Sequence, residues 1–126
     1  MTGTPNLGEF EQIVLLSILR LDDNAYGVRI RSEITTHTGR RVTPGALYTT
    51  LERLDQKGLV SSRVGDPTPE RGGRAKRYYT VSGAGLKALQ RAQSAYQSLL
   101  QGLELLGGKH GQTIAVLFSA DAVYAG

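Results

Sequence analysis

Residues 43–58 contain the feature that most restricts the possible fold, a short helix with strong start and stop signals. Thr43 is a suitable N-cap, and Pro44 occupies the first helical position, where a missing N–H costs nothing. Gly58 follows the predicted helix and is a residue type that commonly ends helices. Leucines at helical spacing give the segment one apolar stripe: Leu47, Leu51 and Leu54. Residues 44–57 therefore predict a helix with one packed side and one polar side that is free for a partner.

Two short strands joined by a long loop are expected after this helix. Residues 60–64 and 77–81 have the alternation of a half-buried strand. Residues 65–76 between them contain prolines and glycines, which favour a long hairpin loop over a tight turn. The segment 71–77 contains four basic side chains and no acidic one.

Two helices are expected before residue 43. Residues 8–21 are apolar on most of a helical circumference, so one side is expected in the domain core and the other in a subunit interface. Asp22-Asp23-Asn24 forms a turn with several possible N-caps. Residues 25–38 then predict a second helix, with a buried stripe at every fourth position that includes Ile30 and Ile34. Gly39 ends it.

Residues 83–106 predict a long last helix, which Ser82 can cap. Its apolar positions follow spacings of three and four, as in a coiled coil, and exceed what a small core can cover. We expect a dimer interface formed by this seam and the first helix: Phe10, Ile13, Leu86, Leu89, Gln93, Tyr96, Leu100 and Leu103. Residues 107–126 have no assignable structure.

The order of these elements predicts the fold class. Three helices followed by a two-stranded hairpin give a mainly α fold with a small β-hairpin (α+β), which is a winged helix-turn-helix with one long C-terminal dimerisation helix. We expect a winged helix DNA-binding domain over 7–81, the dimerisation helix over 82–106 and a tail over 107–126. The loop 65–76 is the wing.

The charge distribution favours a polyanionic partner. Residues 29–77 hold eleven of the fifteen basic side chains but only five of the eleven acidic ones, so the net charge of +4 is concentrated in this part of the chain. A solvated surface of mixed charge is the alternative interpretation.

The sequence offers little for catalysis, metal binding or membrane insertion. Cysteine is absent, and His37 and His110 have no neighbours at metal-ligand spacing. Neither a G-x-S-x-G motif nor a phosphate-loop lysine motif is present. No apolar run approaches the roughly 20 residues of a membrane span, and the N-terminal part carries Glu9 and Glu11 where a secretion signal would be basic. We therefore expect a non-enzymatic cytoplasmic protein with no cofactor and no metal.

The candidate DNA-binding residues lie on the polar face of helix 44–57 and in the wing. A recognition helix reads bases with side chains near its N-terminus, and cations contact phosphates. The helix contributes Thr43, Gly45, Tyr48, Thr49 and Arg53, and the wing contributes Arg71, Gly72, Gly73, Arg74 and Lys76. Arg40 and Arg41 precede the helix and can approach the same phosphates. There are two alternative interpretations. The polar face of the helix contacts only solvent, and the glycine-containing loop is a surface loop with no binding role.

Several of these segments together resemble the phenolic-acid-decarboxylase-regulator (PadR) family of bacterial transcription factors. The strongest match is Thr43-Pro44-Gly45-Ala46-Leu47-Tyr48-Thr49-Thr50-Leu51-Glu52-Arg53-Leu54, followed by Lys57-Gly58-Leu59-Val60. Gly73-Arg74-Ala75-Lys76-Arg77-Tyr78-Tyr79 and Tyr26-Gly27-Val28-Arg29-Ile30 extend it. The resemblance covers about residues 7–106 and is closest to the short subfamily with one C-terminal helix.

This resemblance implies a homodimer that binds a pseudo-palindromic operator in double-stranded DNA, usually as a repressor, with Tyr26 among the phosphate contacts. Some short members bind flat hydrophobic compounds between subunits through a tryptophan of the last helix. This chain has no tryptophan, and Tyr96 is the aromatic residue of that helix, so a small hydrophobic effector stays an open question. Winged helices also serve as protein-docking modules, and an interaction module without DNA binding is the alternative function.

Overall fold

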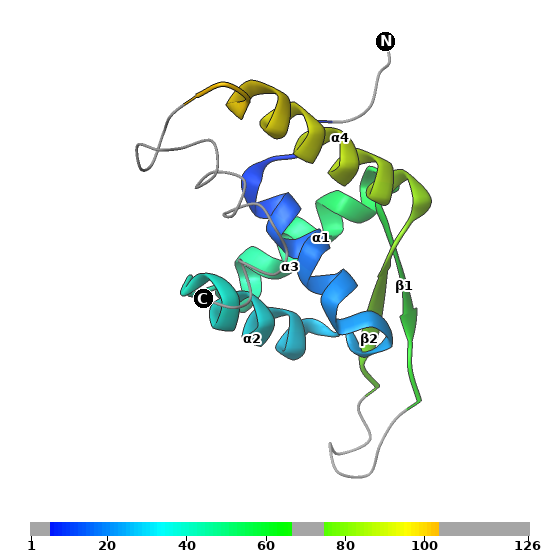
Figure 1. Ribbon diagram of the computed structural model, residues 1–126. Coiled ribbons are helices and arrows are strands. Elements are labelled where there is room, and N and C mark those ends of the chain that lie inside the picture. Colours follow the sequence, from blue (N-terminus) through cyan, green and yellow to red (C-terminus); the bar gives the residue numbers. More distant parts are fainter. Residues whose placement is uncertain (1–5, 67–74, 104–126) are drawn as a thin grey trace. The chain divides into compact units, whose positions relative to one another are not determined.

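The computed structural model describes residues 6–66 and 75–103 and confirms the expected fold class (Figure 1). The elements are α1 (Glu9–Leu21), a short 3₁₀ helix η1 (Asp22–Asn24), α2 (Gly27–Thr38), α3 (Pro44–Gln56), β1 (Val60–Val64), β2 (Arg77–Val81) and α4 (Gly83–Leu100). The described residues fall into two units, which divide after Gln90. The first unit contains the helix-turn-helix, α2 and α3, and the hairpin.

Local hydrogen bonds define the helix starts that the sequence predicts. The Thr43 hydroxyl accepts a hydrogen bond from the Ala46 N–H at 3.1 Å, which caps α3. The Ser82 hydroxyl accepts one from the Gly85 N–H at 3.0 Å at the start of α4, and it donates to the Gly58 carbonyl at 2.7 Å. One serine therefore caps α4 and ties it to the end of α3.

Two element boundaries differ from the expectation by more than one residue. The N-cap of α2 is Tyr26, and none of the polar residues 22–24 caps it, because residues 25–26 are drawn into extended pairing with the hairpin. The last helix was expected to reach about Leu106, but α4 ends at Leu100. Gly102 adopts a φ of +81°, and the Leu103 N–H bonds the Leu100 carbonyl at 3.0 Å. A left-handed glycine of this kind terminates helices.

The core lies where α1, α2 and α3 meet and extends under the hairpin. The leucine stripe of α3 is fully buried, as are Ile30 and Ile34 of α2. The remaining buried apolar residues come from α1, the loops, both strands and the first turns of α4: Val14, Leu15, Ile18, Ala25, Val42, Leu59, Val60, Tyr79, Val81 and Ala88. Packing of the stripe against α1 and α2 leaves the other face of α3 at the surface.

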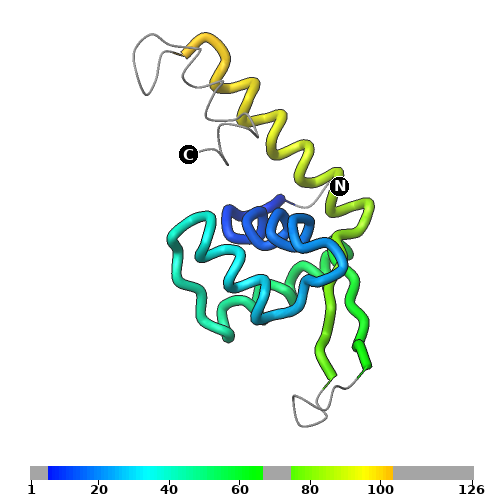
Figure 2. Tube along the Cα trace, turned by 60° about the horizontal axis from the view of Figure 1, so that its bottom comes forward, coloured from blue at the N-terminus to red at the C-terminus, as the bar shows by residue number. Residues whose placement is uncertain are grey.

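The hairpin is antiparallel, and its register pairs Val60 with Val81 and Val64 with Arg77. It stands beside the three-helix cluster (Figure 2). The Tyr79 N–H donates to the Ala25 carbonyl at 2.9 Å, and Tyr26 pairs with Tyr78 as an isolated antiparallel bridge. The segment before α2 thus acts as a short third strand that fixes the hairpin to the start of the helix-turn-helix.

A nearly buried ion pair links α1 to the end of α3. The Lys57 ammonium donates to both carboxylate oxygens of Glu11, at 2.8 and 3.0 Å, and to the Asn6 carbonyl at 3.1 Å. The same carboxylate accepts from the Gly8 N–H at 2.8 Å. Burial alone raises the pKa of Glu11, but these hydrogen bonds and the Lys57 charge outweigh it, so the pKa lies below its ordinary value of 4.5.

We expect Glu11→Gln to lower the free energy of unfolding by about 1–3 kcal/mol at neutral pH, because Lys57 loses its charged partner. A carboxyl whose pKa is depressed by folding stabilises the protein above its unfolded pKa, here about 4.5, and loses that contribution as the pH falls through the folded pKa. Urea unfolding at pH 7 and about pH 3 measures both effects. The exposed Glu9→Gln is the control, with a change below about 0.5 kcal/mol; a difference for Glu11→Gln that persists in acid would contradict the assignment.

Candidate nucleic-acid interface

The exposed face of α3 carries the side chains that the sequence predicts for base contacts. Thr43, Gly45, Tyr48, Thr49 and Arg53 are all exposed, while the leucines on the opposite face are buried. Gly45 has no neighbouring atom within 4 Å of the position a Cβ would take, so the backbone there is open to close approach. The first two turns of α3 thus present small and hydroxyl side chains, and Arg53 follows in its last turn.

Tyr48 packs across the start of α2. A Cβ placed on Gly27 would collide with the Tyr48 hydroxyl, so glycine at this position leaves room for the phenol. Tyr48 nevertheless remains 49% exposed. The contact positions one α3 side chain against the first turn of α2, where backbone N–H groups have no side-chain cap. Its hydroxyl is therefore placed where a phosphate approaching α2 would also lie.

A stack of aromatic and cationic side chains forms the base of the wing. The rings of Tyr26 and Tyr78 meet edge to face with centroids 5.5 Å apart. The Lys76 ammonium lies 4.4 Å from the centroid of the Tyr26 ring, and the Arg63 guanidinium carbon lies 4.7 Å from that of Tyr78. Cations over aromatic faces are attracted by the ring quadrupole, so the two tyrosines hold two wing cations in place. Neither Arg63 nor Tyr78 is among the predicted contact residues, although both lie on predicted strands.

Part of the predicted wing can be placed. The hairpin ladder continues beyond the strands, because the Gly65 N–H donates to the Lys76 carbonyl at 2.7 Å. Arg77 donates to the Ser62 hydroxyl at 3.0 Å across the two strands. Arg71, Gly72, Gly73 and Arg74 lie outside the residues that the structure describes. Lys76 is thus the one predicted wing contact whose surroundings are defined here.

The structure separates the two arginines that precede α3. Arg40 bonds the Glu9 carboxylate at 3.1 Å and lies over the Phe10 ring, so its charge is directed toward the start of α1. Arg41 is exposed and lines a groove beside α2. The two adjacent arginines therefore have different surroundings, and their shared approach to phosphates stays a prediction.

A second hollow, of about 370 Å³, lies between α3 and the hairpin. Glu52 and Asp55 from α3 line it together with Arg77 and Tyr79 from β2. Burial raises the pKa of the Tyr79 hydroxyl, and the nearby Arg77 charge only partly opposes this, so the phenol stays protonated at neutral pH. This hollow combines both signs of charge and is less suited to a polyanion than the face of α3.

The residues predicted for a dimer interface differ in exposure. Phe10, Ile13 and Leu89 are partly buried against the core of their own chain. On α4, Leu86 is 41% and Tyr96 57% exposed, and Leu103, which follows the end of the helix, is 44% exposed. Gln93 is exposed as well, and Leu100 is half-buried. On α1 the exposed large apolar residues are Leu16 and Leu19, which the predicted interface did not include.

Other kinds of site find no support in the described part of the chain. Within residues 6–66 and 75–103, no group of three or more histidine, cysteine, aspartate or glutamate side chains is arranged to hold a metal ion. Among the same residues no helix has the length and apolarity needed to cross a membrane.

Residues 15–91, which include α2, α3, both strands and most of α1, match the model of the Transcriptional regulator PadR-like family. The chain belongs to the PadR-like family of transcriptional regulators. The transcriptional regulator Rv3488 of Mycobacterium tuberculosis is 40% identical over 90 residues, which cover 70% of this chain and 76% of the relative. The family is one of regulators rather than of enzymes.

Solved structures share the fold. A PadR family transcriptional regulator from Eggerthella lenta is 25% identical, with a TM-score of 0.59 over 75% of this chain and 81% of that one. The ORC1 protein of Aeropyrum pernix, solved in complex with DNA, is 25% identical with a TM-score of 0.55 over 73% of this chain and 26% of its own length. The PadR-like winged helix of this chain is therefore one version of a more widely used fold.

Two glycines of this PadR-like chain should respond differently to alanine. At Gly85 an added Cβ would meet the Leu59 carbonyl oxygen and lie 2.7 Å from a Val81 methyl, neither of which can move freely. We expect Gly85→Ala to cost about 1–3 kcal/mol of unfolding free energy, and Gly27→Ala to change it by less than about 1 kcal/mol, since the half-exposed Tyr48 ring can swing away. Urea unfolding of both variants tests this, and equal losses would contradict it.

Proposed function

We propose that this chain is a sequence-specific DNA-binding regulator that docks α3 in the major groove and its wing on the backbone or in the minor groove. The observation that carries the proposal is the position of the exposed, small-residue first half of α3 beside cations held at the wing base. A helix presented in this way meets base edges, while oriented cations meet phosphates. Membership in a family of transcriptional regulators supports the same interpretation.

The residues divide into two roles. Thr49 can donate or accept a hydrogen bond or touch a thymine methyl, and Arg53 can reach a guanine or the backbone, so these two supply selectivity. Thr43, Gly45 and the α3 N-terminus allow close approach to the DNA. Phosphate contacts set the register and come from Tyr26, Tyr48, Arg41, Lys76 and the wing residues Arg71 and Arg74. Arg40 is the weakest member of the set, because Glu9 already partners it.

The functional unit in this proposal is a homodimer. The α4 seam exposes Leu86 and Tyr96 at a and d positions of a heptad repeat, which fits a coiled-coil contact with a second copy. A two-fold dimer would present two α3 helices about one DNA turn apart, roughly 34 Å, to a pseudo-palindromic operator. Residues 82–106 would then form the dimerisation segment and residues 7–81 the DNA-binding domain.

Repression of genes in a bacterial cytoplasm is the regulatory outcome that we propose. A bound dimer would exclude the transcription machinery from the operator. A small hydrophobic effector could release it only by binding more tightly to a state whose α3 helices are wrongly spaced. Tyr96 is the aromatic side chain on the seam where such a compound would stack.

A protein-docking module without DNA binding is the alternative function. Winged helices serve both purposes, so the fold alone does not decide between them. A docking module has no need of cations held in place beside a capped helix with small residues at its start. A gel shift on random duplex DNA at low salt separates the two functions, since a docking module leaves the duplex unshifted.

We expect Thr49→Ala to relax the choice among operators with little loss on random DNA, whereas Arg74→Ala and Lys76→Ala weaken binding to all sequences alike. Operators are first selected from a random duplex pool, and affinities are then titrated at 50 and 200 mM salt. Each lost phosphate contact reduces the slope of log K against log salt by about 0.9. Lys87→Ala, which removes an exposed charge on α4, is the control, and a uniform effect of Thr49→Ala would assign it to the backbone instead.

We expect Leu86→Asp to raise the dimer dissociation constant at least about tenfold, because a carboxylate in the seam must be desolvated on association. Ser98→Asp adds the same charge at an exposed position opposite the seam and should leave the constant unchanged. Sedimentation equilibrium measures both variants. A monomeric wild-type protein, or equal effects of the two substitutions, would rule out the seam as the dimer interface.

A further inference from the structure

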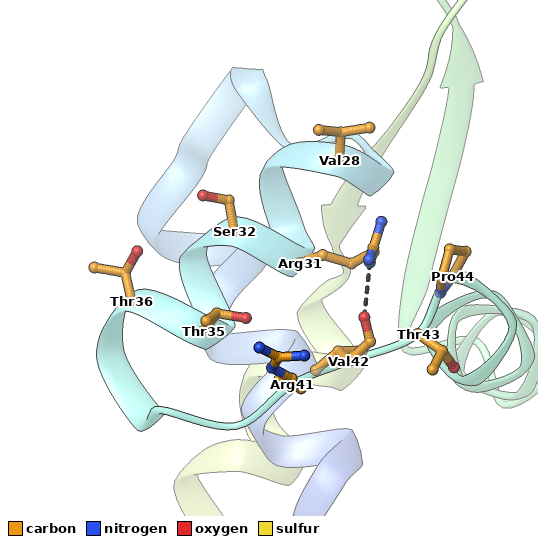
Figure 3. Close-up of a pocket in the computed structure, with 9 residues that line it drawn as sticks. All are labelled: Val28, Arg31, Ser32, Thr35, Thr36, Arg41, Val42, Thr43 and Pro44. Carbon is orange, nitrogen blue, oxygen red and sulfur yellow. Dashed lines mark hydrogen bonds between the residues drawn. The ribbon is translucent and has the colours of Figure 1, made fainter.

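An open groove of about 600 Å³ runs between α2 and the turn that leads into α3. Figure 3 shows Val28, Arg31, Ser32 and Thr35 along the α2 side and residues 41–44 along the other. Thr43 and Pro44, which start α3, belong to the groove wall. Whatever occupies the groove therefore lies directly beside the first turn of the proposed recognition helix.

The chemistry of the groove fits a sugar–phosphate chain. Arg31 and Arg41 supply two guanidinium groups, and hydroxyls come from Ser32, Thr36 and Thr43, while the Thr35 hydroxyl donates to the Arg40 carbonyl at 3.0 Å. None of its lining residues is acidic. Guanidinium and hydroxyl donors bind phosphate oxygens, and the exposed apolar Val28 and Pro44 offer contact to a deoxyribose.

The acidic residue of α2 is held away from the groove. Glu33 accepts one hydrogen bond from Arg20 of α1 at 2.7 Å and pairs with His37 at 3.1 Å. Both partners lie outside the groove lining. The carboxylate is thus committed to α1 and the far side of α2, which leaves the positive charge of the groove uncompensated locally.

The guanidinium groups of Arg31 and Arg41 differ in their contacts with the rest of the protein. Arg31 donates its Nε–H to the Val42 carbonyl at 2.8 Å, which fixes the side chain and the turn while leaving the terminal N–H groups for a ligand (Figure 3). Arg41 makes no hydrogen bond or ion pair with any described residue. One cation is therefore already oriented, and the other can move to meet an anion.

We propose that this groove binds a segment of the DNA backbone that flanks the bases contacted by α3, with Arg31 and Arg41 on its phosphates and Val28 and Pro44 against its sugars. The inference rests on the proposed function and adds Arg31, Ser32 and Thr36 to the contact surface. The groove is open rather than enclosed, which suits a strand that passes through it better than a small molecule that must be surrounded. A free phosphate-bearing compound shares the chemistry and is distinguished by the test.

The test uses the full chain and operator duplexes selected from a random pool, with Arg41→Ala and Ser32→Glu as groove variants. Arg31 is left intact because it also holds the turn. Arg29→Ala removes the same charge from an exposed position of α2 that does not line the groove. We expect Arg41→Ala to weaken binding roughly three- to tenfold per subunit and to reduce the salt slope by about 0.9 per subunit, with no change in sequence preference. Ser32→Glu should weaken binding further, and Arg29→Ala should do neither.

Neutral methylphosphonate substitutions, introduced one at a time along the duplex, identify the phosphate. At one position per half-site the substitution should weaken wild-type binding but not weaken Arg41→Ala further. If wild-type protein binds the operator while Arg41→Ala matches Arg29→Ala and no such position exists, the groove proposal is wrong and DNA binding stands. If wild-type protein binds no duplex, the proposed function fails as well. Amide shifts of groove residues on titration with inorganic phosphate, without coupling to any methylphosphonate, would reassign the groove to a free anion.

Discussion

The hydrogen bond from the Tyr79 N–H to the Ala25 carbonyl connects the two halves of the DNA-binding unit. It joins β2 to the chain immediately before α2, and the Tyr26–Tyr78 bridge extends the pairing by one residue. A two-stranded hairpin alone is marginally stable, and a third short strand gives it a fixed edge. The wing base therefore keeps its orientation relative to the helix-turn-helix, and the cations on it are placed together with α3 rather than independently of it.

Local sequence signals were sufficient for most of the fold. Thr43 with Pro44, and Ser82 with the following glycines, gave correct helix starts because N-capping depends only on neighbouring residues. Both strands were predicted at their observed bounds. The start of α2 was less accurate because Tyr26 is held by β2, a partner some fifty residues away that no local pattern reveals. The apolar spacing predicted for the last helix continues in the sequence to Leu106. The helix nevertheless ends earlier, because Gly102 adopts a left-handed conformation that the spacing does not reveal.

The candidate site was harder to predict than the fold. Spacing along the sequence shows on which face of a helix or strand a side chain lies, but not which other side chains it contacts. Arg40 and Arg41 have the same chemistry and adjacent positions, yet Arg40 is bonded to Glu9, thirty-one residues earlier. Arg63 and Tyr78 looked like ordinary strand residues until the register placed them opposite each other. Arg31 is similar: the groove that it lines exists only once α2 packs beside the turn into α3. Pairings of this kind depend on the fold and become visible only with it.

Positive charge in this molecule is available for recognition where its neighbours do not neutralise it. Tyrosine rings and a backbone carbonyl orient Lys76, Arg63 and Arg31 while leaving their net charge intact. Carboxylates instead hold Arg40 and Lys57, and those pairs brace α1 against the turn before α3 and the end of α3. Oriented cations lose less side-chain entropy when they meet a phosphate, so each contributes more to binding than a freely moving charge would. The basic excess between residues 29 and 77 is thus divided into a structural set facing α1 and a set available to a polyanion around α3 and the wing.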